Sequence, residues 1–354
     1  MKKLLIVSLH PRGGCFLYST EIIARITDDK EVYLNEITDE KHNIKNFKTL
    51  KCYGFGWKRF FSLFFFLLKI YFYGKFTNRY KALLIMGFTA WDSFIAKVFK
   101  WTGKPVFSVI HDGKVHKGET CDFTQKRLLS TMNDSDYLIF LSEYVRQLVK
   151  DNFFIDKISH IAPHGLISYG NIPTKPKWKR EKPVLLFLGR LSEYKGINIL
   201  IEVLKNVPDV FEKVIIAGKA VPEYQVPSFD NPKIEVINRW LTDNEMADFL
   251  NECDILLFPY IEATQSGIAS LAINYLVPSI VSDVGGLKEQ FLGNSVFFIK
   301  PSSTEDLYRA IVELCTNDEL YSELSMKLLQ SRNSYSWDSI AKSLQTFINK
   351  HSVR

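Results

Sequence analysis

The sequence VLLFLGRLSEYKGINILIEVLKN, residues 184–206, decides the fold. It begins with a short apolar run, Val184 to Leu188, of the kind found in buried parallel strands. A polar loop containing Gly189 and Gly196 follows, and apolar residues then recur at helical spacing. The stretch therefore predicts a strand, a glycine-bearing loop and a helix whose N-terminus presents free backbone N–H groups and a positive dipole end.

Two cations make this loop a candidate diphosphate site. Arg190 can hold phosphate oxygens as a fork, whereas Lys195 acts as a point charge. The alternative is that both are solvated cations on an ordinary strand-to-helix turn, since most surface cations bind no ligand. Taken alone, the stretch leaves both interpretations open.

A second segment, residues 254–289, repeats the pattern. It predicts a strand over 255–258, a small hydroxyl-rich loop and a helix that begins near Gly267. Thr264 and Ser266 then lie at a second helix N-terminus. Helix capping is the alternative role for these hydroxyls, but one hydroxyl is enough to cap a helix. Two such termini converge at the carboxyl ends of parallel strands, where open α/β sheets bind ligands.

The pairing of GR…YKG with ATQSG…P…VGGLKE resembles the nucleotide-binding half of the retaining GT-B glycosyltransferases of family 4, the group 1 type. The resemblance covers nearly the whole chain and is more specific in its C-terminal half. It implies that two cations neutralise the donor's diphosphate and that the small loop supplies backbone N–H contacts. The residues assigned to donor binding are Gly13, Gly14, Gly189, Arg190, Lys195, Thr264, Ser266 and Gly267.

One departure from the family pattern concerns two glutamates that many members carry eight positions apart. One contacts the donor sugar and the other the ribose, and the matching positions here are Ala263 and Leu271. Neither side chain can ionise or accept a hydrogen bond. Glu262 is adjacent to the first position and is a candidate substitute. A subgroup with an ATQSG loop resembles this chain in lacking the pair, which leaves recognition of the ribose unassigned.

Composition is that of a globular protein with two domains. The chain has 354 residues, with 46% hydrophobic and 24% charged residues. Its five cysteines are odd in number and lack CxxC spacing, which indicates free thiols in a reducing compartment. We expect no metal site. The start, MKKLLIVSLH, lacks a cleavage site and is interpreted as the first strand, not a signal peptide.

The order of elements predicts two doubly wound α/β sheets, because strands and helices alternate in each half. By resemblance the fold is GT-B, two Rossmann-like domains facing each other across a cleft. Residues 1–172 are the expected acceptor-binding domain, 173–183 a Pro- and Lys-rich linker, and 184–334 the nucleotide-sugar-binding domain. In the family the last helix, here within 335–354, packs back onto the first domain.

Catalytic candidates in the first half follow a predicted strand. His111 and Asp112 lie at its carboxyl end, where chemistry is well placed, although a lone histidine there is more often a structural hydrogen-bond partner. The string HDxxxHxGE resembles the same glycosyltransferase subgroup. The resemblance brings His111 near the donor sugar, and leaves Asp112 either as the base or as the group that orients His111. The acceptor or sugar candidates are His116, Glu119, Glu143, His164 and Glu262.

A basic, aromatic-rich segment spans residues 55–81. It contains no acidic residue, and its uninterrupted apolar run, Leu63 to Leu68, is far shorter than the ~20 residues that cross a bilayer. A helix of this composition can lie in the interface of an anionic membrane. The alternative is a crossover helix buried by its neighbours, with its cations extended into solvent. No nucleic-acid-binding motif accompanies the basic residues.

These observations predict a retaining glycosyltransferase of the hexosyltransferase type. We expect no cofactor other than the nucleotide-sugar donor, with UDP- or GDP-linked sugars favoured over ADP-linked ones. The expected acceptor is a glycan or lipid-linked glycan of capsule, O-antigen or exopolysaccharide synthesis, and the expected location is cytoplasmic, peripheral on the inner face of the plasma membrane. A non-catalytic nucleotide-sugar-binding protein and a sugar-nucleotide epimerase stay open as alternatives.

Overall fold

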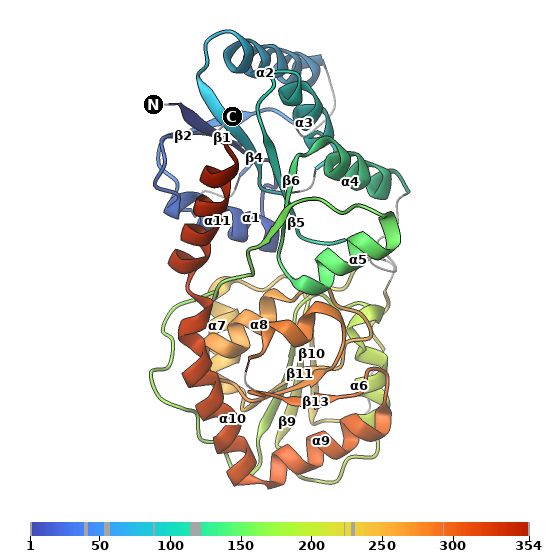
Figure 1. The fold of residues 1–354 in the computed structure, drawn as a ribbon. Coiled ribbons are helices and arrows are strands. Elements are labelled where there is room, and N and C mark those ends of the chain that lie inside the picture. The colour runs from blue at the N-terminus through green and yellow to red at the C-terminus, as the bar shows by residue number, and fades with distance from the viewer. Residues whose placement is uncertain are drawn as a thin grey trace. The chain divides into compact units, whose positions relative to one another are not determined.

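The fold consists of two compact units, each built on one parallel sheet (Figure 1). The first contains the described residues up to Gly165 together with those from Ser336 onward, and the second runs from Leu166 to Tyr335. The computed structural model describes residues 2–38, 42–52, 57–87, 89–113, 122–222, 224–227, 231–292 and 294–352, without the side chains of 122–124.

The described strands of the first unit form a sheet in the order β3-β2-β1-β4-β5-β6-β7. They are β1 (Lys3–Ser8), β2 (Lys30–Asn35), β3 (Phe47–Leu50), β4 (Tyr80–Ile85), β5 (Val106–Ile110), β6 (Tyr137–Phe140) and β7 (Ser159–Ile161). The helices are α1 (Gly14–Arg25), α2 (Trp57–Lys75), α3 (Asp92–Lys100), α4 (Asp122–Asp134), α5 (Glu143–Phe153) and α11 (Trp337–Ser352). The order reverses between β1 and β4, as in dinucleotide-binding sheets.

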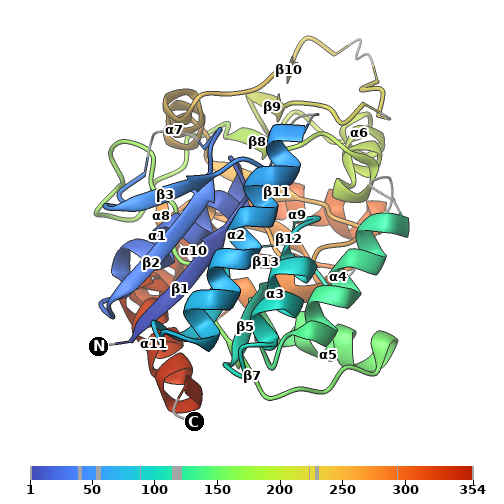
Figure 2. The same cartoon turned by 90° about the horizontal axis from the view of Figure 1, so that it is seen from above.

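Helices cover both faces of this first sheet because successive strand residues point to opposite sides. Leu4 and Ile6 of β1 pack in one core with residues of α1 and α11. Leu5 and Val7 pack in another with residues of α2 and α3, two helices that lie side by side along the sheet (Figure 2). The C-terminal helix α11 therefore completes the core of the first unit.

The second unit repeats the topology, with described strands in the order β10-β9-β8-β11-β12-β13. They are β8 (Val184–Leu188), β9 (Lys213–Gly218), β10 (Ile234–Asn238), β11 (Ile255–Phe258), β12 (Ser279–Ser282) and β13 (Phe297–Ile299). The helices are α6 (Ile197–Leu204), α7 (Asp243–Glu252), α8 (Gly267–Asn274), α9 (Thr304–Thr316) and α10 (Asp318–Ser331), with 3-10 turns η1 (Glu193–Lys195), η2 (Gly285–Gln290) and η3 (Arg332–Tyr335). The predicted pair of doubly wound sheets is confirmed.

The predicted linker, residues 173–183, is part of the second unit in the structure. Lys177 donates from Nζ to the carbonyl oxygens of Leu250, Asn251 and Cys253 at 2.7, 3.1 and 2.5 Å. These carbonyls lie at the C-terminal end of α7, where a cation is favourable. The division at Gly165 therefore falls earlier than the predicted residue 172, because side chains after it are anchored to the second unit.

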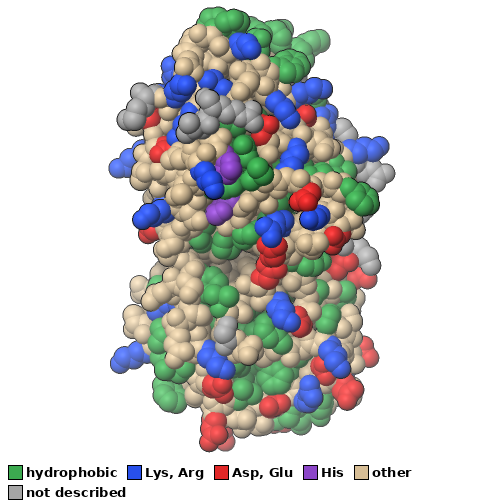
Figure 3. Space-filling view, viewed as in Figure 1, with side chains coloured by type: hydrophobic (Ala, Val, Ile, Leu, Met, Phe, Trp, Pro, Cys, Tyr) green, Lys and Arg blue, Asp and Glu red, His purple; other side chains and the backbone are tan. Residues whose placement is uncertain are grey.

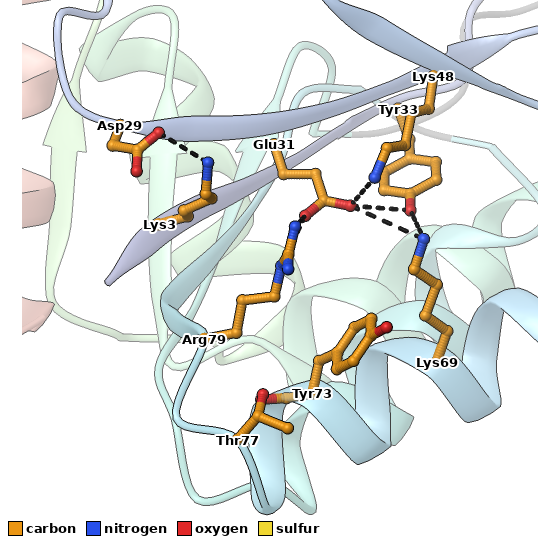
Figure 4. A network of polar contacts seen from close by, with 9 residues as sticks. All are labelled: Lys3, Asp29, Glu31, Tyr33, Lys48, Lys69, Tyr73, Thr77 and Arg79. Carbon is orange, nitrogen blue, oxygen red and sulfur yellow. Dashed lines mark hydrogen bonds and ion pairs between the residues drawn. The ribbon is translucent and has the colours of Figure 1, made fainter. Parts of the chain in front are cut away.

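A buried carboxylate, Glu31 of β2, organises one edge of the first unit (Figure 4). It accepts hydrogen bonds from Lys48 Nζ at 2.5 Å, Tyr33 Oη at 3.0 Å and Arg79 Nε at 3.0 Å. Burial alone would raise the pKa of Glu31, but these three bonds outweigh it and hold the pKa at about 2. The ionised form is therefore strongly favoured in the folded state.

We expect Glu31→Gln to lower the free energy of unfolding by about 1–2 kcal/mol at pH 7, a value discounted because Lys48 and Arg79 are partly exposed. Since the folded pKa is below the usual 4.5, this stability is present above pH 4.5 and is lost as the pH falls towards 2. Urea unfolding at pH 7 and pH 3.5 measures it. The half-exposed pair Glu36–Lys51 supplies the control, Glu36→Gln. If Glu31→Gln lowered the free energy of unfolding equally at both pH values, the low pKa would not belong to Glu31.

Two further expectations concern thiols and membranes. Cys15, Cys52, Cys253 and Cys315 are free, which confirms the prediction for the cysteines that the structure describes. Cys121 lies outside the described residues. Among the helices in the described ranges, none combines the length and apolar character needed to cross a membrane.

Candidate functional site

The candidate donor site lies where the strand order of the second sheet reverses, between β8 and β11. The loop after β8 contains residues 189–196, and the loop after β11 contains residues 259–266. Both leave the carboxyl ends of neighbouring parallel strands, and each leads into a helix, α6 and α8. Crevices at such reversals bind ligands in open α/β folds.

Two glycines shape the first loop. Gly189 has φ +124° and Gly196 has φ +71°, conformations that other residues rarely adopt. A Cβ on Gly196 would lie 1.7 Å from the Pro259 carbonyl oxygen, so the absence of a side chain lets the two loops touch. Gly196 is also the residue between η1 and α6, and it fixes the position of Lys195 directly before it.

Lys195 is buried, with 7% of its surface exposed, although it carries a charged group. Its Nζ donates a 2.7 Å hydrogen bond to Tyr260 Oη and lies 3.9 Å from the centroid of that ring. Burial raises the pKa of Tyr260, so the phenol stays protonated at neutral pH. The Lys195 ammonium is thus positioned by a neutral phenol, through a hydrogen bond to the hydroxyl and a cation–π contact with the ring.

Ser266 joins this cluster from the second loop. Its Oγ lies 3.3 Å from Tyr260 Oη, and although Ser266 is the N-cap of α8, its side chain makes no capping hydrogen bond. Gln290 clamps the backbone instead: Ser266 N donates to Gln290 Oε1 at 2.7 Å, and Gln290 Nε2 donates to the Ser266 carbonyl at 3.1 Å. Gly267, the first residue of α8, follows this clamp directly.

Arg190 is exposed and extends from the same loop. Its Nη2 lies 3.5 Å from Tyr194 Oη, and its charge lowers the pKa of Tyr260 against the larger effect of burial. Thr264 is buried in the loop after β11. The structure thus brings the predicted second-half residues, from Gly189 and Arg190 to Ser266 and Gly267, to one end of one sheet.

The family's two glutamate positions are apolar and packed in this structure. Ala263 and Leu271 are 6% and 1% exposed, so neither side chain can serve a ribose. Glu262 lies beside them, and its Oε2 is shielded from solvent without a hydrogen-bond partner among the described residues. A buried carboxylate oxygen of this kind calls for a hydrogen-bond partner, and the described residues do not supply one.

His111 follows β5 in the first unit and lies near the reversal between β1 and β4. Its Nε2 is 3.2 Å from the Met86 carbonyl oxygen, and its ring meets Tyr18 edge-on at 5.1 Å. Burial lowers the pKa of His111, but contacts with Cys15, Asp112 and the Met86 carbonyl outweigh it and raise the pKa to about 9. These contacts therefore favour the protonated ring relative to a free histidine.

His164 lies on the other side of Tyr18, at 5.8 Å between ring centroids. Burial lowers the pKa of His164 to about 4, with a smaller contribution from the charge of His111. Its Nδ1 is 2.7 Å from the Gly165 carbonyl oxygen, and its Nε2 is buried without a hydrogen-bond partner in the described parts of the chain. The pKa values of the two histidines are thus shifted in opposite directions.

The other described candidates of the first unit lie at the starts of helices α1 and α5. Gly13 has φ +85° and is the N-cap of α1, and Gly14 begins that helix with open space where a side chain would be. Glu143 is the first residue of α5 and pairs with Arg146. His116 and Glu119 lie outside the described residues.

Sequence reasoning missed several residues that build these clusters: Cys15, Tyr18, Tyr194, Tyr260 and Gln290. Of these residues, only Tyr260 could have been identified from the sequence, because a tyrosine that follows an apolar strand so closely lies at the ligand-binding end of the sheet. Gln290 is 24 residues from Ser266, and no local pattern indicates their contact.

Replacing Tyr260 with phenylalanine tests how Lys195 is positioned. The ring is retained and only the hydroxyl that meets Lys195 and Ser266 is removed. We expect about a tenfold weaker affinity for a nucleoside diphosphate, equivalent to one lost charge-assisted hydrogen bond, and a free energy of unfolding lower by about 1–3 kcal/mol because the buried ammonium loses that bond. Tyr224→Phe, whose hydroxyl bonds to exposed Asn198, is the matched control. Unchanged affinity in Tyr260→Phe would exclude the positioning role.

Part of the sequence and the fold as a whole are similar to those of known proteins. Residues 182–317 match the family model of the glycosyl transferases group 1. An uncharacterized glycosyltransferase of Methanocaldococcus jannaschii is 25% identical over 212 residues, which are 58% of this chain and 57% of that protein. The chain spans about half the length of the named relatives that it matches.

Solved structures extend the likeness to the whole chain. HepE of Anabaena in complex with UDP superposes with a TM-score of 0.74 at 14% identity, covering 98% of this chain and 100% of that one. The lipopolysaccharide outer core galactosyltransferase WaaB superposes with a TM-score of 0.69 at 13% identity, covering 99% of each chain. The family match and the named relatives support a glycosyltransferase. The chain has the GT-B fold, and its residues 182–317 match the group 1 glycosyl transferases.

Proposed function

We propose that the protein is a retaining glycosyltransferase of family 4 that moves a sugar from a nucleoside-diphosphate donor to a glycan or lipid-linked acceptor. The observation that carries the proposal is the buried Lys195, held by Tyr260 beside Arg190 and the start of α8. Cations and helix N-termini gathered at one sheet reversal are suited to a diphosphate.

In this reaction the bond between the anomeric carbon and the diphosphate breaks, and a bond from the acceptor oxygen to that carbon forms on the same face of the sugar. The electron pair of the broken bond leaves with the diphosphate. Arg190 and Lys195 are the groups proposed to stabilise that charge, and preorganised charges of this kind lower the barrier. The proton of the acceptor hydroxyl leaves with a base or with the departing phosphate.

The first unit is proposed to contribute His111 and Asp112. Because its neighbours raise the pKa of His111, the ring is better suited to donating a hydrogen bond than to acting as the base. Asp112 is adjacent to His111 in the chain and is one cause of its raised pKa. Both predicted roles of Asp112 stay in the proposal, as the base or as the group that orients His111.

The proposed donor is UDP- or GDP-linked, and the complexes of HepE with UDP and UDP-glucose favour UDP. The proposed role is in capsule, O-antigen or exopolysaccharide synthesis in the cytoplasm. It rests on the resemblance of the sequence motifs, and the fold that this chain shares with a lipopolysaccharide galactosyltransferase is consistent with it.

Incubation of the full chain with UDP-, GDP- and ADP-sugars, with and without glycolipid extracts of bacterial membranes, tests the proposal. We expect nucleoside diphosphate release that depends on one donor and on acceptor, and a product with the donor's anomeric configuration by NMR. A changed sugar nucleotide without acceptor would identify an epimerase. Tight nucleotide binding with no turnover of any donor would favour a non-catalytic binding protein.

A further inference from the structure

Helix α2 is apolar on two opposite faces. Leu63, Phe66, Ile70 and Gly74 are buried against the first unit. The opposite side carries Phe60, Phe61, Phe64, Phe65, Leu68 and Phe72, each between 45% and 62% exposed. These positions recur at spacings of three and four and therefore form one continuous stripe along the helix. We refer to these six residues as the outer apolar face of α2.

Helix α3 lies next to α2. The Arg59 guanidinium lies 5.1 Å from the ring of Trp91 at the start of α3, and a Cβ on Gly74 would lie 2.7 Å from Thr102 just beyond its end, so α2 and α3 run in the same direction (Figure 2). Trp101, which is 61% exposed, follows α3 at that end. Figure 3 shows hydrophobic side chains gathered over α2. Exposed apolar patches of this size mark interaction sites.

The surroundings of the face are positively charged. Residues 41–91 contain ten Lys and Arg and no Asp or Glu. Lys58 and Lys75 are exposed on α2 itself. Three cations, Lys48, Lys69 and Arg79, gather around the single carboxylate of Glu31 beside the helix (Figure 4), which leaves this cluster with a net positive charge.

We propose that the outer apolar face of α2 docks on a bilayer that contains anionic lipids, with the helix axis in the membrane plane. Aromatic side chains enter the headgroup and acyl boundary, while the flanking lysines and arginines meet lipid phosphates. The charge distribution selects this occupant over a second copy of the chain, because two copies of this face would bring like charges together. This surface is outside the donor site and does not depend on the proposed transfer activity.

Vesicle flotation of the full chain tests the proposal, with phosphatidylcholine vesicles and with vesicles that also contain phosphatidylglycerol. We expect binding to the anionic vesicles and at least about tenfold weaker partitioning of Phe61→Ser/Phe65→Ser, since each buried phenyl ring contributes strongly to partitioning. Lys58→Glu/Lys75→Glu is expected to weaken partitioning onto anionic vesicles by at least a similar factor, because each cation near the surface strengthens that partitioning about fivefold. All four sites are on the surface, so circular dichroism should report unchanged folding.

Matched controls are Phe154→Ser, at a phenylalanine that is 90% exposed elsewhere on the first unit, and Lys205→Glu on the second unit. Both should bind anionic vesicles like the wild type. The proposal is overturned if the wild type ignores anionic vesicles, if it binds neutral and anionic vesicles equally, or if it dimerises in solution in a way that Phe61→Ser/Phe65→Ser abolishes while vesicles have no effect. Nucleotide binding, measured in parallel, separates this result from any failure of the donor site.

Discussion

Lys195→Ala should reduce the turnover of the nucleotide-sugar donor by about 100- to 1,000-fold, the loss typical of removing one preorganised group that stabilises developing charge. The ammonium is 7% exposed and hydrogen bonded to Tyr260, so it is fixed before a ligand arrives. Alanine cannot replace that charge, and the nearby Arg190 is an exposed side chain held less firmly. Steady-state release of nucleoside diphosphate by wild type and variant measures the effect.

Lys205→Ala is the matched control, because Lys205 is an exposed lysine just after the same helix α6. It should retain wild-type turnover. If Lys195→Ala also kept turnover within a few-fold of wild type, Lys195 would be a structural cation and the charge stabilisation would have to come from another residue.

Gly196→Ala is expected to have the largest effect on folding. An alanine there must adopt φ +71° and would bring its Cβ to 1.7 Å from the Pro259 carbonyl oxygen, a backbone atom that moves only if the loop moves. The combined strain should lower the free energy of unfolding by at least about 3 kcal/mol and the melting temperature by about 6–12 °C.

Differential scanning calorimetry of the full chain compares this variant with Gly14→Ala. Gly14 is the first residue of helix α1, yet its backbone is not left-handed and no atom lies within 4 Å of the added Cβ. That control should melt within about a degree of wild type, since an unstrained Gly→Ala change in a helix is neutral to mildly stabilising. Equal melting of both variants would mean that the contact with Pro259 is not needed.

Local patterns explain which parts of the fold the sequence could predict. Strands β8 and β11 begin and end at the predicted residues, because each is a continuous apolar run that ends at a turn residue. Thr242 and Glu245 form a capping box at the start of α7, a local pattern of four residues. The shorter strands β3, β7 and β13 were missed: three or four residues carry too little periodicity to identify.

The sequence could not predict the whole site, because some of its residues are far apart in the chain and meet only in the fold. The predicted loops contain Arg190, Lys195 and Ser266, but the sequence gives no sign that Tyr260 holds Lys195 or that Gln290 clamps Ser266. The same limit applies to α2, where sequence left a buried helix and a membrane-facing helix as alternatives. The structure shows an inner apolar face and an outer one, since burial depends on which side meets the sheet.

Isothermal titration calorimetry of UDP, GDP and ADP into the wild type and Lys195→Ala tests the central claim most directly, that the reversal between β8 and β11 binds a nucleoside diphosphate. The account predicts micromolar binding of one nucleotide to the wild type and its loss in Lys195→Ala, with Lys205→Ala unaffected. Binding of none of the three nucleotides, or equal binding by wild type and Lys195→Ala, would contradict it.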